Sequence, residues 1–357
     1  MIFKLYTMNK YFFLLLSLIL FSCSKKERAS VLPEEIKVEN VEKIERIKLK
    51  SKVLIDSILG AFSVANDSRH IFLSTPENTE SKSLLQIFNK KGVLEASVLN
   101  RGGGPNDVIN ARIIKQRNEK NSLWINDVTS RKLKLLNVSE SISNQSAKID
   151  QVVRFNEASA YAFFIKDSLF VLETMKNSNY WLTFFNPITQ TTVFDKPIYP
   201  NSSKHFTVLY QSIWAAKSDK TWIVGAMEAL NQINFVSLVD AKKSFSVSLG
   251  SATDVEKAID NEGVVKHAYY CDVATTSEYI FALKLDQVEE ESYEIAKPVT
   301  VEVLDWNGKP QYVLEIDEYL LDISVDEEFK KIYGLGIDGT VYEYEYELNG
   351  ILQHLNN

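Results

Sequence analysis

The sequence contains few of the residues that build metal centres, with two cysteines and four histidines among 357 residues. The histidines are His70, His205, His267 and His354. They show no ligand spacing, and a zinc site needs clustered Cys and His. Calcium is harder to exclude, because oxygen ligands are plentiful and can converge from separate parts of a chain. No Asp-rich loop of the calcium-hand type occurs. We therefore predict no cofactor and leave calcium open without a supporting motif.

The motifs of hydrolytic chemistry are also missing. The chain has neither Gly-x-Ser-x-Gly nor His-Glu-x-x-His. Its formal charge of −7 argues against nucleic acid and anionic lipid headgroups as partners. These absences predict a protein that is not an enzyme and has no nucleic-acid partner.

The amino terminus carries an apolar run, 11–21, behind Lys4 and Lys10. The run is too short to span a bilayer, which needs roughly 20 apolar residues. Its features are those of a secretory signal over residues 1–22. The following Leu20-Phe21-Ser22-Cys23 resembles the lipobox of bacterial lipoproteins. That resemblance implies lipidation of Cys23 and a membrane anchor.

Further expectations follow from a lipidated Cys23. Ser24, rather than Asp, resembles the signal that sorts lipoproteins to the outer membrane, and the orientation toward periplasm or cell surface stays open. Cys271 becomes the only thiol, so no internal disulfide can form. Pro33 and a high charge content predict that residues 23–40 are the lipidated Cys and a flexible tether. Residues 41–357 are then one folded domain.

One short phrase recurs six times, in which a polar turn precedes an apolar strand that carries an aromatic residue. Its copies are Ile71-Phe72, Leu123-Trp124, Leu169-Phe170, Thr221-Trp222, Ile280-Phe281 and Ile332-Tyr333. The successive aromatics are 52, 46, 52, 59 and 52 residues apart. A period near 50 built from strands is typical of a β-propeller with one blade per repeat. We predict an all-β fold, a six-bladed β-propeller of four-stranded antiparallel blades, with these aromatics packed between blades.

A second repeated mark predicts the end of each third strand. It is an apolar residue followed by Asn or Asp, at Phe88-Asn89, Leu136-Asn137, Phe185-Asn186, Val239-Asp240, Leu304-Asp305 and Leu348-Asn349. Such residues accept the backbone angles of a chain reversal. Residues 41–49 alternate apolar and polar side chains and are the candidate for the outer strand that completes the last blade.

The loop 101–107 is the unusual connection, Arg101-Gly102-Gly103-Gly104-Pro105-Asn106-Asp107. At this loop the chain resembles the six-bladed TolB-like β-propeller lipoproteins of the Bacteroidetes type. Those often carry Gly-x-Gly-Pro-Gly/Asn-Glu-Phe here, and this chain departs from the phrase with Asp107 and Val108. The resemblance implies no established enzymatic activity. The glycines either allow a tight crossing of backbones or place polar groups at the channel mouth.

The candidate ligand-binding residues come from places where the repeats differ. They are Arg101, Asn106 and Asp107 in the glycine loop, Tyr210 and Gln211 before the fourth blade, and His267 and Tyr270 before the fifth. First strands line the channel of a propeller, so such residues could form a recognition surface. The alternative is that these side chains pack between blades.

Three functions follow in order of preference. The first is a lipid-anchored envelope binding or scaffold module that recognises a protein, peptide or glycan on the channel-mouth face. The second is a calcium-dependent, lactonase-like hydrolase with its site in the central channel, which requires converging carboxylates there. The third is a structural part of an envelope assembly.

Overall fold

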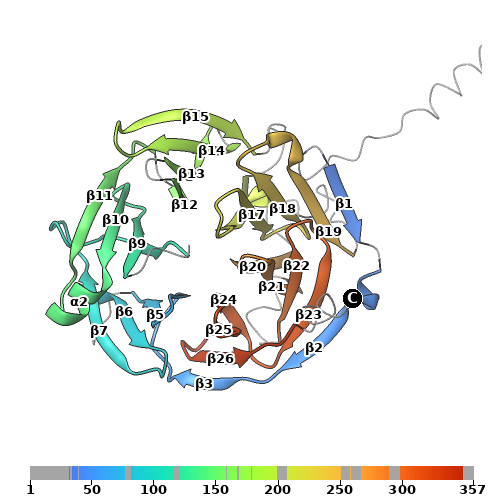
Figure 1. Ribbon diagram of the computed structural model, residues 1–357, viewed down its shortest axis with the longest axis horizontal. Coiled ribbons are helices and arrows are strands. Elements are labelled where there is room, and N and C mark those ends of the chain that lie inside the picture. The colour runs from blue at the N-terminus through green and yellow to red at the C-terminus, as the bar shows by residue number, and fades with distance from the viewer. Residues whose placement is uncertain are drawn as a thin grey trace, which may run out of the picture.

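The computed structural model describes residues 32–348, except 33, 39, 77–81, 116–120, 158, 167–168, 178, 199–206, 251–257, 259–266 and 289–297. Six sheets form a ring around a central axis, with the strands of each sheet following one another outward (Figure 1). The predicted six-bladed, all-β propeller with antiparallel blades is confirmed. Cys23, His205 and His354 lie outside the described residues.

Each blade runs from a first strand near the axis to an outer strand. Blade 1 contains β4 (Ser63–Asn66), β5 (His70–Ser74), β6 (Ser83–Asn89) and β7 (Leu94–Asn100). Blade 2 contains β8 (Ala111–Ile113), β9 (Ser122–Asp127), β10 (Lys132–Asn137) and β11 (Ile149–Arg154), with the helix α2 (Val138–Asn144) between the last two. Blade 3 contains β12 (Ser159–Lys166), β13 (Leu169–Lys176), β14 (Asn179–Asn186) and β15 (Thr191–Pro197).

The second half of the ring has the same order. Blade 4 contains β16 (Ser212–Ala216), β17 (Trp222–Met227), β18 (Ile233–Ser237) and β19 (Phe245–Leu249). Blade 5 contains β20 (His267–Thr275), β21 (Tyr279–Val288), β22 (Thr300–Asp305) and β23 (Pro310–Ile316). Blade 6 contains β24 (Leu320–Asp326), β25 (Lys331–Gly336) and β26 (Val341–Glu345), and its outer strand is β3 (Lys52–Ile55). Short 3-10 turns are η1 (Val41–Lys43), η3 (Thr207–Tyr210) and η4 (Ala241–Lys243).

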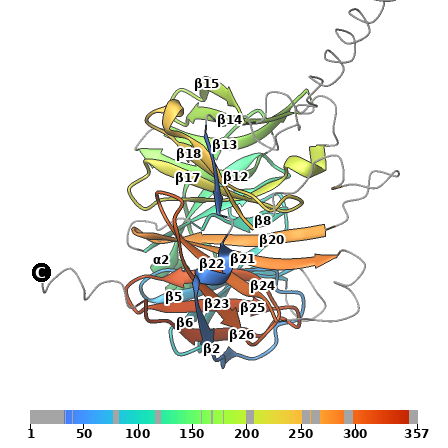
Figure 2. The same cartoon turned by 90° about the vertical axis from the view of Figure 1, so that its right-hand side faces the viewer.

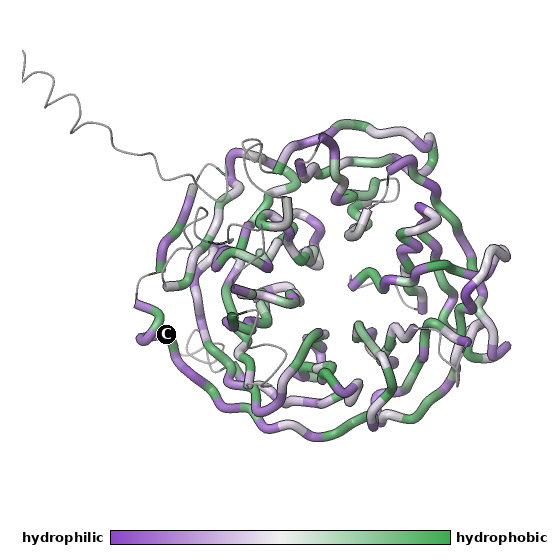
Figure 3. Tube along the Cα trace, turned by 180° about the vertical axis from the view of Figure 1, so that it is seen from behind, coloured by the Kyte–Doolittle hydropathy of each residue, from purple (hydrophilic) through white to green (hydrophobic). Residues whose placement is uncertain are grey.

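The core lies between the blades. Six clusters of buried apolar side chains each join two neighbouring blades, including blade 6 to blade 1. Figure 3 shows apolar stretches in every blade of the ring. The predicted packing role of the repeated aromatics is confirmed, since Phe72, Phe170, Phe281 and Tyr333 are each at most 1% exposed. Trp124 and Phe170 pack edge to face with centroids 5.2 Å apart, across the boundary of blades 2 and 3.

The repeated Asn or Asp ends the third strand as predicted in blades 1, 2, 3 and 5. Its side-chain oxygen then accepts hydrogen bonds from the turn, as when Asn89 accepts from the amides of Lys91 and Val93. In blade 4 the strand stops earlier, at Ser237, and Asp240 accepts from the amide of Lys242 within the next turn. In blade 6 the strand stops at Glu345, before the predicted end, and Asn349 lies outside the described residues.

The amino-terminal segment corrects two predictions. Residues 41–49 do not complete the last blade, because β2 (Glu45–Leu49) pairs in parallel with β23 as a fifth strand of blade 5. The strand that completes blade 6 is β3, antiparallel to β26. The chain passes from β3 to β4 within a few residues, so the strand just before blade 1 must belong to its neighbour, blade 6.

The predicted tether also contains a strand. β1 (Glu34–Val38) pairs in parallel with β19 as a fifth strand of blade 4. Its Ile36 and Val38 pack against the core between blades 4 and 5, whereas Lys37 between them is exposed. The segment therefore runs around the outside of blades 4, 5 and 6 in turn, as Figures 1 and 2 show.

Ring closure brings backbones into direct contact at Gly339. Its φ of +82° is in the left-handed region, and a Cβ there would lie 2.1 Å from the carbonyl oxygen of Ile58. The amide of Ile58 donates to the carbonyl of Gly339 at 3.1 Å. Only glycine fits without moving the segment that leaves β3.

We predict that Gly339→Ala lowers the free energy of unfolding by about 1–3 kcal/mol, because alanine adds both backbone strain and a clash. Denaturant unfolding measures the change. The matched control is Gly103→Ala, since a Cβ at Gly103 meets nothing within 4 Å. Equal stability of the two variants would show that the contact at Gly339 does not constrain the closed ring.

Candidate functional site

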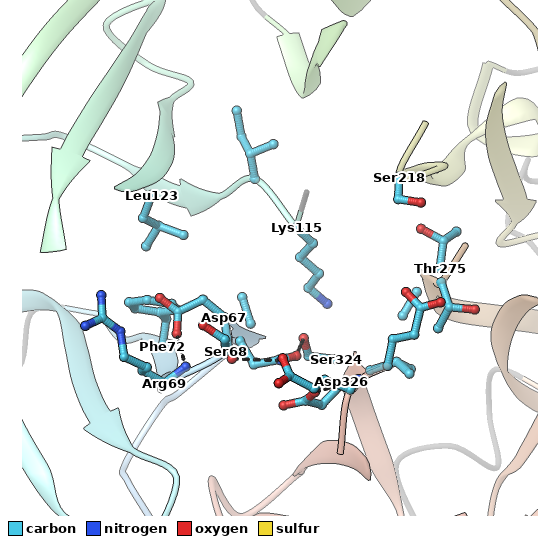
Figure 4. A pocket seen from close by; sticks show the side chains of 18 of the residues that line it. Asp67, Ser68, Arg69, Phe72, Lys115, Leu123, Ser218, Thr275, Ser324 and Asp326 are labelled. Carbon is cyan, nitrogen blue, oxygen red and sulfur yellow. Dashed lines mark hydrogen bonds between the residues drawn. The ribbon is translucent and has the colours of Figure 1, made fainter. Parts of the chain in front are cut away.

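A cavity of about 990 Å³ opens on the face where each first strand turns into its second strand. Its lining comes from blades 1, 2, 4, 5 and 6. Blade 1 supplies its whole first turn, Asn66 to Arg69, and blade 6 supplies Ser324 to Glu328. Ser218 and Thr275 lie on the other side, as Figure 4 shows. Residues at or beside the first turns of five of the six blades therefore meet around one hollow.

Lys115 reaches into this cavity from the end of the first strand of blade 2 (Figure 4). Its Nζ lies 2.6 Å from Asp272 Oδ2 and 2.6 Å from Asp322 Oδ2, and it donates to the carbonyl of Ile323 at 3.1 Å. We call Lys115, Asp272 and Asp322 the ion triad. Because Asp272 belongs to blade 5 and Asp322 to blade 6, Lys115 crosses the axis of the ring.

The two carboxylates of the ion triad are held by backbone amides as well. Asp272 Oδ2 accepts from the amide of Ile323 at 2.7 Å, and Asp322 Oδ1 accepts from the amide of Val64 at 2.7 Å. The triad thus connects blades 1, 2, 5 and 6. Hydrogen bonds to every member offset part of the cost of burying three charges.

In the ion triad, burial and the neighbouring charges have opposing effects on the pKa values. Burial lowers the pKa of Lys115, but the two aspartates outweigh it and the pKa is raised overall. Burial, and next the charge of Asp272, raise the pKa of Asp322 to about 7 against the opposing effect of Lys115. One lysine does not fully compensate two buried carboxylates, so Asp322 takes up a proton more readily than an ordinary aspartate.

A second group of polar residues lies toward the opposite end of the channel, around Glu173. Glu173, on β13, is 6% exposed and accepts from Trp214 Nε1 at 2.7 Å. Burial, helped by the charge of Glu228, raises its pKa to about 8 although the hydrogen bond from Trp214 and the charge of Arg112 oppose the shift. Burial also raises the pKa of Glu228, which the hydrogen bond from Gln211 and the charge of Arg112 counteract.

The glycine loop lies over blade 2, and hydrogen bonds to Asp107 and to two backbone carbonyls hold its conformation. Asp107 Oδ2 accepts from the amide of Gly104 at 3.0 Å, and Lys134 on β10 donates to the carbonyl oxygens of Pro105 and Asp107. A Cβ at Gly102 or Gly104 would lie 2.5 or 2.6 Å from Asp107 Oδ2. These glycines leave room for the Asp107 side chain, which folds back into the loop, and the close approach is to this side chain rather than to a second backbone.

The predicted site residues fall into separate places. Arg101 and Asn106 are exposed in the glycine loop, on the face opposite to the cavity. Gln211 donates to Glu228 at 2.8 Å, and the amide of Tyr269 donates to the carbonyl of Glu228 at 2.7 Å, so the starts of blades 4 and 5 do meet. His267 is half-buried, with Nε2 2.8 Å from Asp286 Oδ1.

The two predicted tyrosines are buried. Tyr210 is 3% exposed in the core between blades 3 and 4. Tyr270 is 1% exposed, and its hydroxyl donates to Glu302 Oε2 at 2.7 Å, where Glu302 also pairs with Lys284. Both side chains pack between blades, which is the alternative that the sequence left open.

The sequence reasoning missed the residues that line the cavity, namely Lys115 and the polar turns of blades 1, 4 and 6. One signal could have found the ion triad. Charged residues occur in or directly after first strands that otherwise pack or line the axis, and Lys115, Asp272 and Asp322 all stand at such positions.

Metal ligands do not cluster in the described ranges: no group of three or more His, Cys, Asp or Glu side chains there could hold a metal ion. The carboxylates of Asp272 and Asp322 turn to Lys115 and to backbone amides, so this pair does not offer a calcium coordination set. Among the residues described, no helix is both long and apolar enough to cross a membrane.

Solved structures show the same fold. A protein of Bacteroides fragilis whose name assigns it to export is 14% identical, covers 87% of this chain and 98% of its own, and has a TM-score of 0.53. A member of the DUF4221 family from Bacteroides vulgatus is 12% identical, covers 84% and 97%, and has a TM-score of 0.56. At these identities the likeness shows the fold alone. No protein-family model matches the sequence, and no curated protein matches it.

The buried acid predicts a pH dependence. Because Glu173 has a pKa of about 8 in the folded state, the folded protein holds its proton between about pH 4.5 and 8 while the unfolded chain releases it. Stability should therefore fall as pH rises through this window, by up to about 5 kcal/mol from this group, since each pKa unit corresponds to about 1.4 kcal/mol. Glu173→Gln should remove that part of the decline.

Denaturant unfolding at pH 5.5 and 8.5 compares wild type, Glu173→Gln and Glu345→Gln, the last being an exposed acid at the end of β26. The same pH dependence in all three proteins would contradict a buried, protonated Glu173.

Proposed function

We propose that this protein is a lipid-anchored binding or scaffold module of a bacterial envelope, and that its protein, peptide or glycan ligand binds in the cavity beside the ion triad. The observation that supports the proposal best is the cavity itself, about 990 Å³ in volume. Small-molecule sites are typically about 300–1,000 Å³ and are largely preformed. Here six packed blades and a cross-axis ion triad fix the walls before any ligand arrives.

The proposed binding face differs from the one expected from the sequence. In the glycine loop, Asp107 accepts from the amide of Gly104 and Lys134 donates to the carbonyl oxygen of Pro105, whereas the cavity gathers residues from five blades on the opposite face. Turns carried by a rigid scaffold are the usual position for recognition residues. We therefore place the ligand on the cavity face and assign the glycine loop a local structural role.

The envelope location rests on Leu20-Phe21-Ser22-Cys23 and on the Bacteroides fragilis structure whose name assigns it to export. We propose a TolB-like lipoprotein of the outer membrane, held by lipid on Cys23. Several acyl chains on one residue supply a stable anchor without a spanning helix, because each buried CH₂ contributes about 0.8 kcal/mol.

Cys23→Ser should move the protein from the membrane fraction to the soluble fraction and abolish incorporation of radiolabelled palmitate. Cys271→Ser is the control, because Cys271 belongs to blade 5 and lies far along the chain from the lipobox. A membrane-bound, labelled Cys23→Ser protein would contradict the anchor.

The cavity can be blocked without disturbing the core, because Ser218 is exposed in the first turn of blade 4. We expect Ser218→Trp to lose the ligand that co-purifies from the native envelope, seen as an added mass by native mass spectrometry. Ser143→Trp, on an exposed position of α2, should retain it. Equal retention by both variants would place the ligand elsewhere.

A further inference from the structure

Five of the six charged side chains that line the cavity already have a polar partner, and the sixth, Glu328, is exposed. Arg69 donates to Asn121 Oδ1 at 3.3 Å, and Glu327 accepts from the amide of Ser277 at 3.1 Å. Lys115 pairs with Asp272 and Asp322, and Asp326 pairs with Lys90 at 2.7 Å. Asp67 accepts from two backbone amides and faces His70. A ligand with a strong charge of its own would have to compete with these pairs. A phosphate-bearing ligand in particular finds Lys115 occupied by two carboxylates.

The remaining polar groups are mostly neutral. The lining includes eight hydroxyl or amide side chains, Asn66, Ser68, Asn121, Ser122, Ser218, Thr275, Thr276 and Ser324. Hydroxyls can both donate and accept, and paired carboxylates such as Asp67 and Asp326 keep lone pairs that accept further hydrogen bonds. This is a lining that can hydrogen-bond to many hydroxyl groups at once.

Two of these hydroxyls are free to bind a ligand. In the described part of the chain, the side chains of Ser68 and Ser218 form no hydrogen bond, and both are exposed. Ser68 belongs to blade 1 and Ser218 to blade 4, which stand opposite each other in a six-bladed ring. The two serines therefore bracket the mouth of the cavity from opposite sides (Figure 4).

The apolar part of the lining is small and aliphatic. It consists of Ala65, Ile114, Leu123, Ala216, Ala274 and Val325, with Phe72 as its single aromatic side chain. Phe72 is 1% exposed and offers no free ring face. An aromatic ligand would find no stacking partner here. The C–H faces of a saturated ring, by contrast, can pack on alanine and valine.

From this combination we infer that the cavity binds a neutral saccharide, held by hydroxyl groups from opposite blades and by the paired carboxylates. The inference rests on the proposed binding function of the cavity and narrows its ligand. A peptide fits less well, because the cavity supplies strand ends and turns and no free sheet edge for backbone pairing.

The test is native mass spectrometry and calorimetry of the purified protein with neutral di- to tetrasaccharides built from hexoses and N-acetylhexosamines. Spermidine, a hexose phosphate and a tetrapeptide are the comparison probes. We expect at least one neutral saccharide to bind and the comparison probes not to bind. Ser68→Ala and Ser218→Ala should each weaken binding about threefold to tenfold, the loss of one hydrogen bond. Ser143→Ala should leave it unchanged.

Two results would overturn the inference: no neutral saccharide binds, or spermidine, the hexose phosphate or the tetrapeptide binds with the same dependence on Ser68 and Ser218. Either result would concern the saccharide alone. Whether the cavity binds any ligand is tested separately, by the Ser218→Trp variant and the ligand that co-purifies from the native envelope. Saccharide binding that neither serine variant changes would also contradict the site, because it would place the sugar outside the bracketed mouth.

Discussion

The structure depends on an ion triad at its axis, in which one lysine from blade 2 meets two aspartates from blades 5 and 6. The interfaces between neighbouring blades are apolar, and the hydrophobic effect that holds them together is non-directional. The triad instead fixes distances across the ring, between blades that do not touch. Its members also bind the amides of Val64 and Ile323, so the inner ends of four blades are held at one point. This arrangement determines the shape of the cavity.

At the outer edge of the ring, strand pairing rather than an ion pair connects the blades. The chain runs around blades 4 and 5 as β1 and β2, and then supplies the outer strand of blade 6 as β3. A sheet edge covered by a strand of the same chain is no longer available for pairing with other molecules. Cys271 is the one cysteine among the described residues, so cohesion in this part of the chain comes from packing, pairing and the ion triad.

The sequence was sufficient to predict the fold because its repeats combine two local signals. One is an aromatic residue in each second strand, buried in every blade except blade 4, where Trp222 is half-buried. The other is a turn-forming Asn or Asp at the end of most third strands. Each signal depends only on residues that are close together in the sequence. The route of the amino-terminal segment could not be predicted in this way. The alternation in residues 41–49 indicates a strand correctly, but parallel pairing with β23 depends on a partner more than 250 residues away. The ion triad could not be predicted from local sequence either, because Lys115 and Asp322 meet only when the ring closes. Tyr270 shows the converse: its polar surroundings suggested recognition, while its hydroxyl satisfies a buried Glu302.

The most direct measurement is the free energy of unfolding of Lys115→Met, which leaves two buried carboxylates without their cation. We predict a loss of about 3–5 kcal/mol, the cost of removing one partner from a buried ionic group. Adding Asp272→Asn and Asp322→Asn to the same protein should recover much of that loss, because the unpaired charges disappear while their oxygens still accept from backbone amides. Lys148→Met, which removes an exposed pair with Glu140, should cost about 0–1 kcal/mol. If Lys115→Met costs no more than Lys148→Met, the ion triad does not hold the axis of the ring.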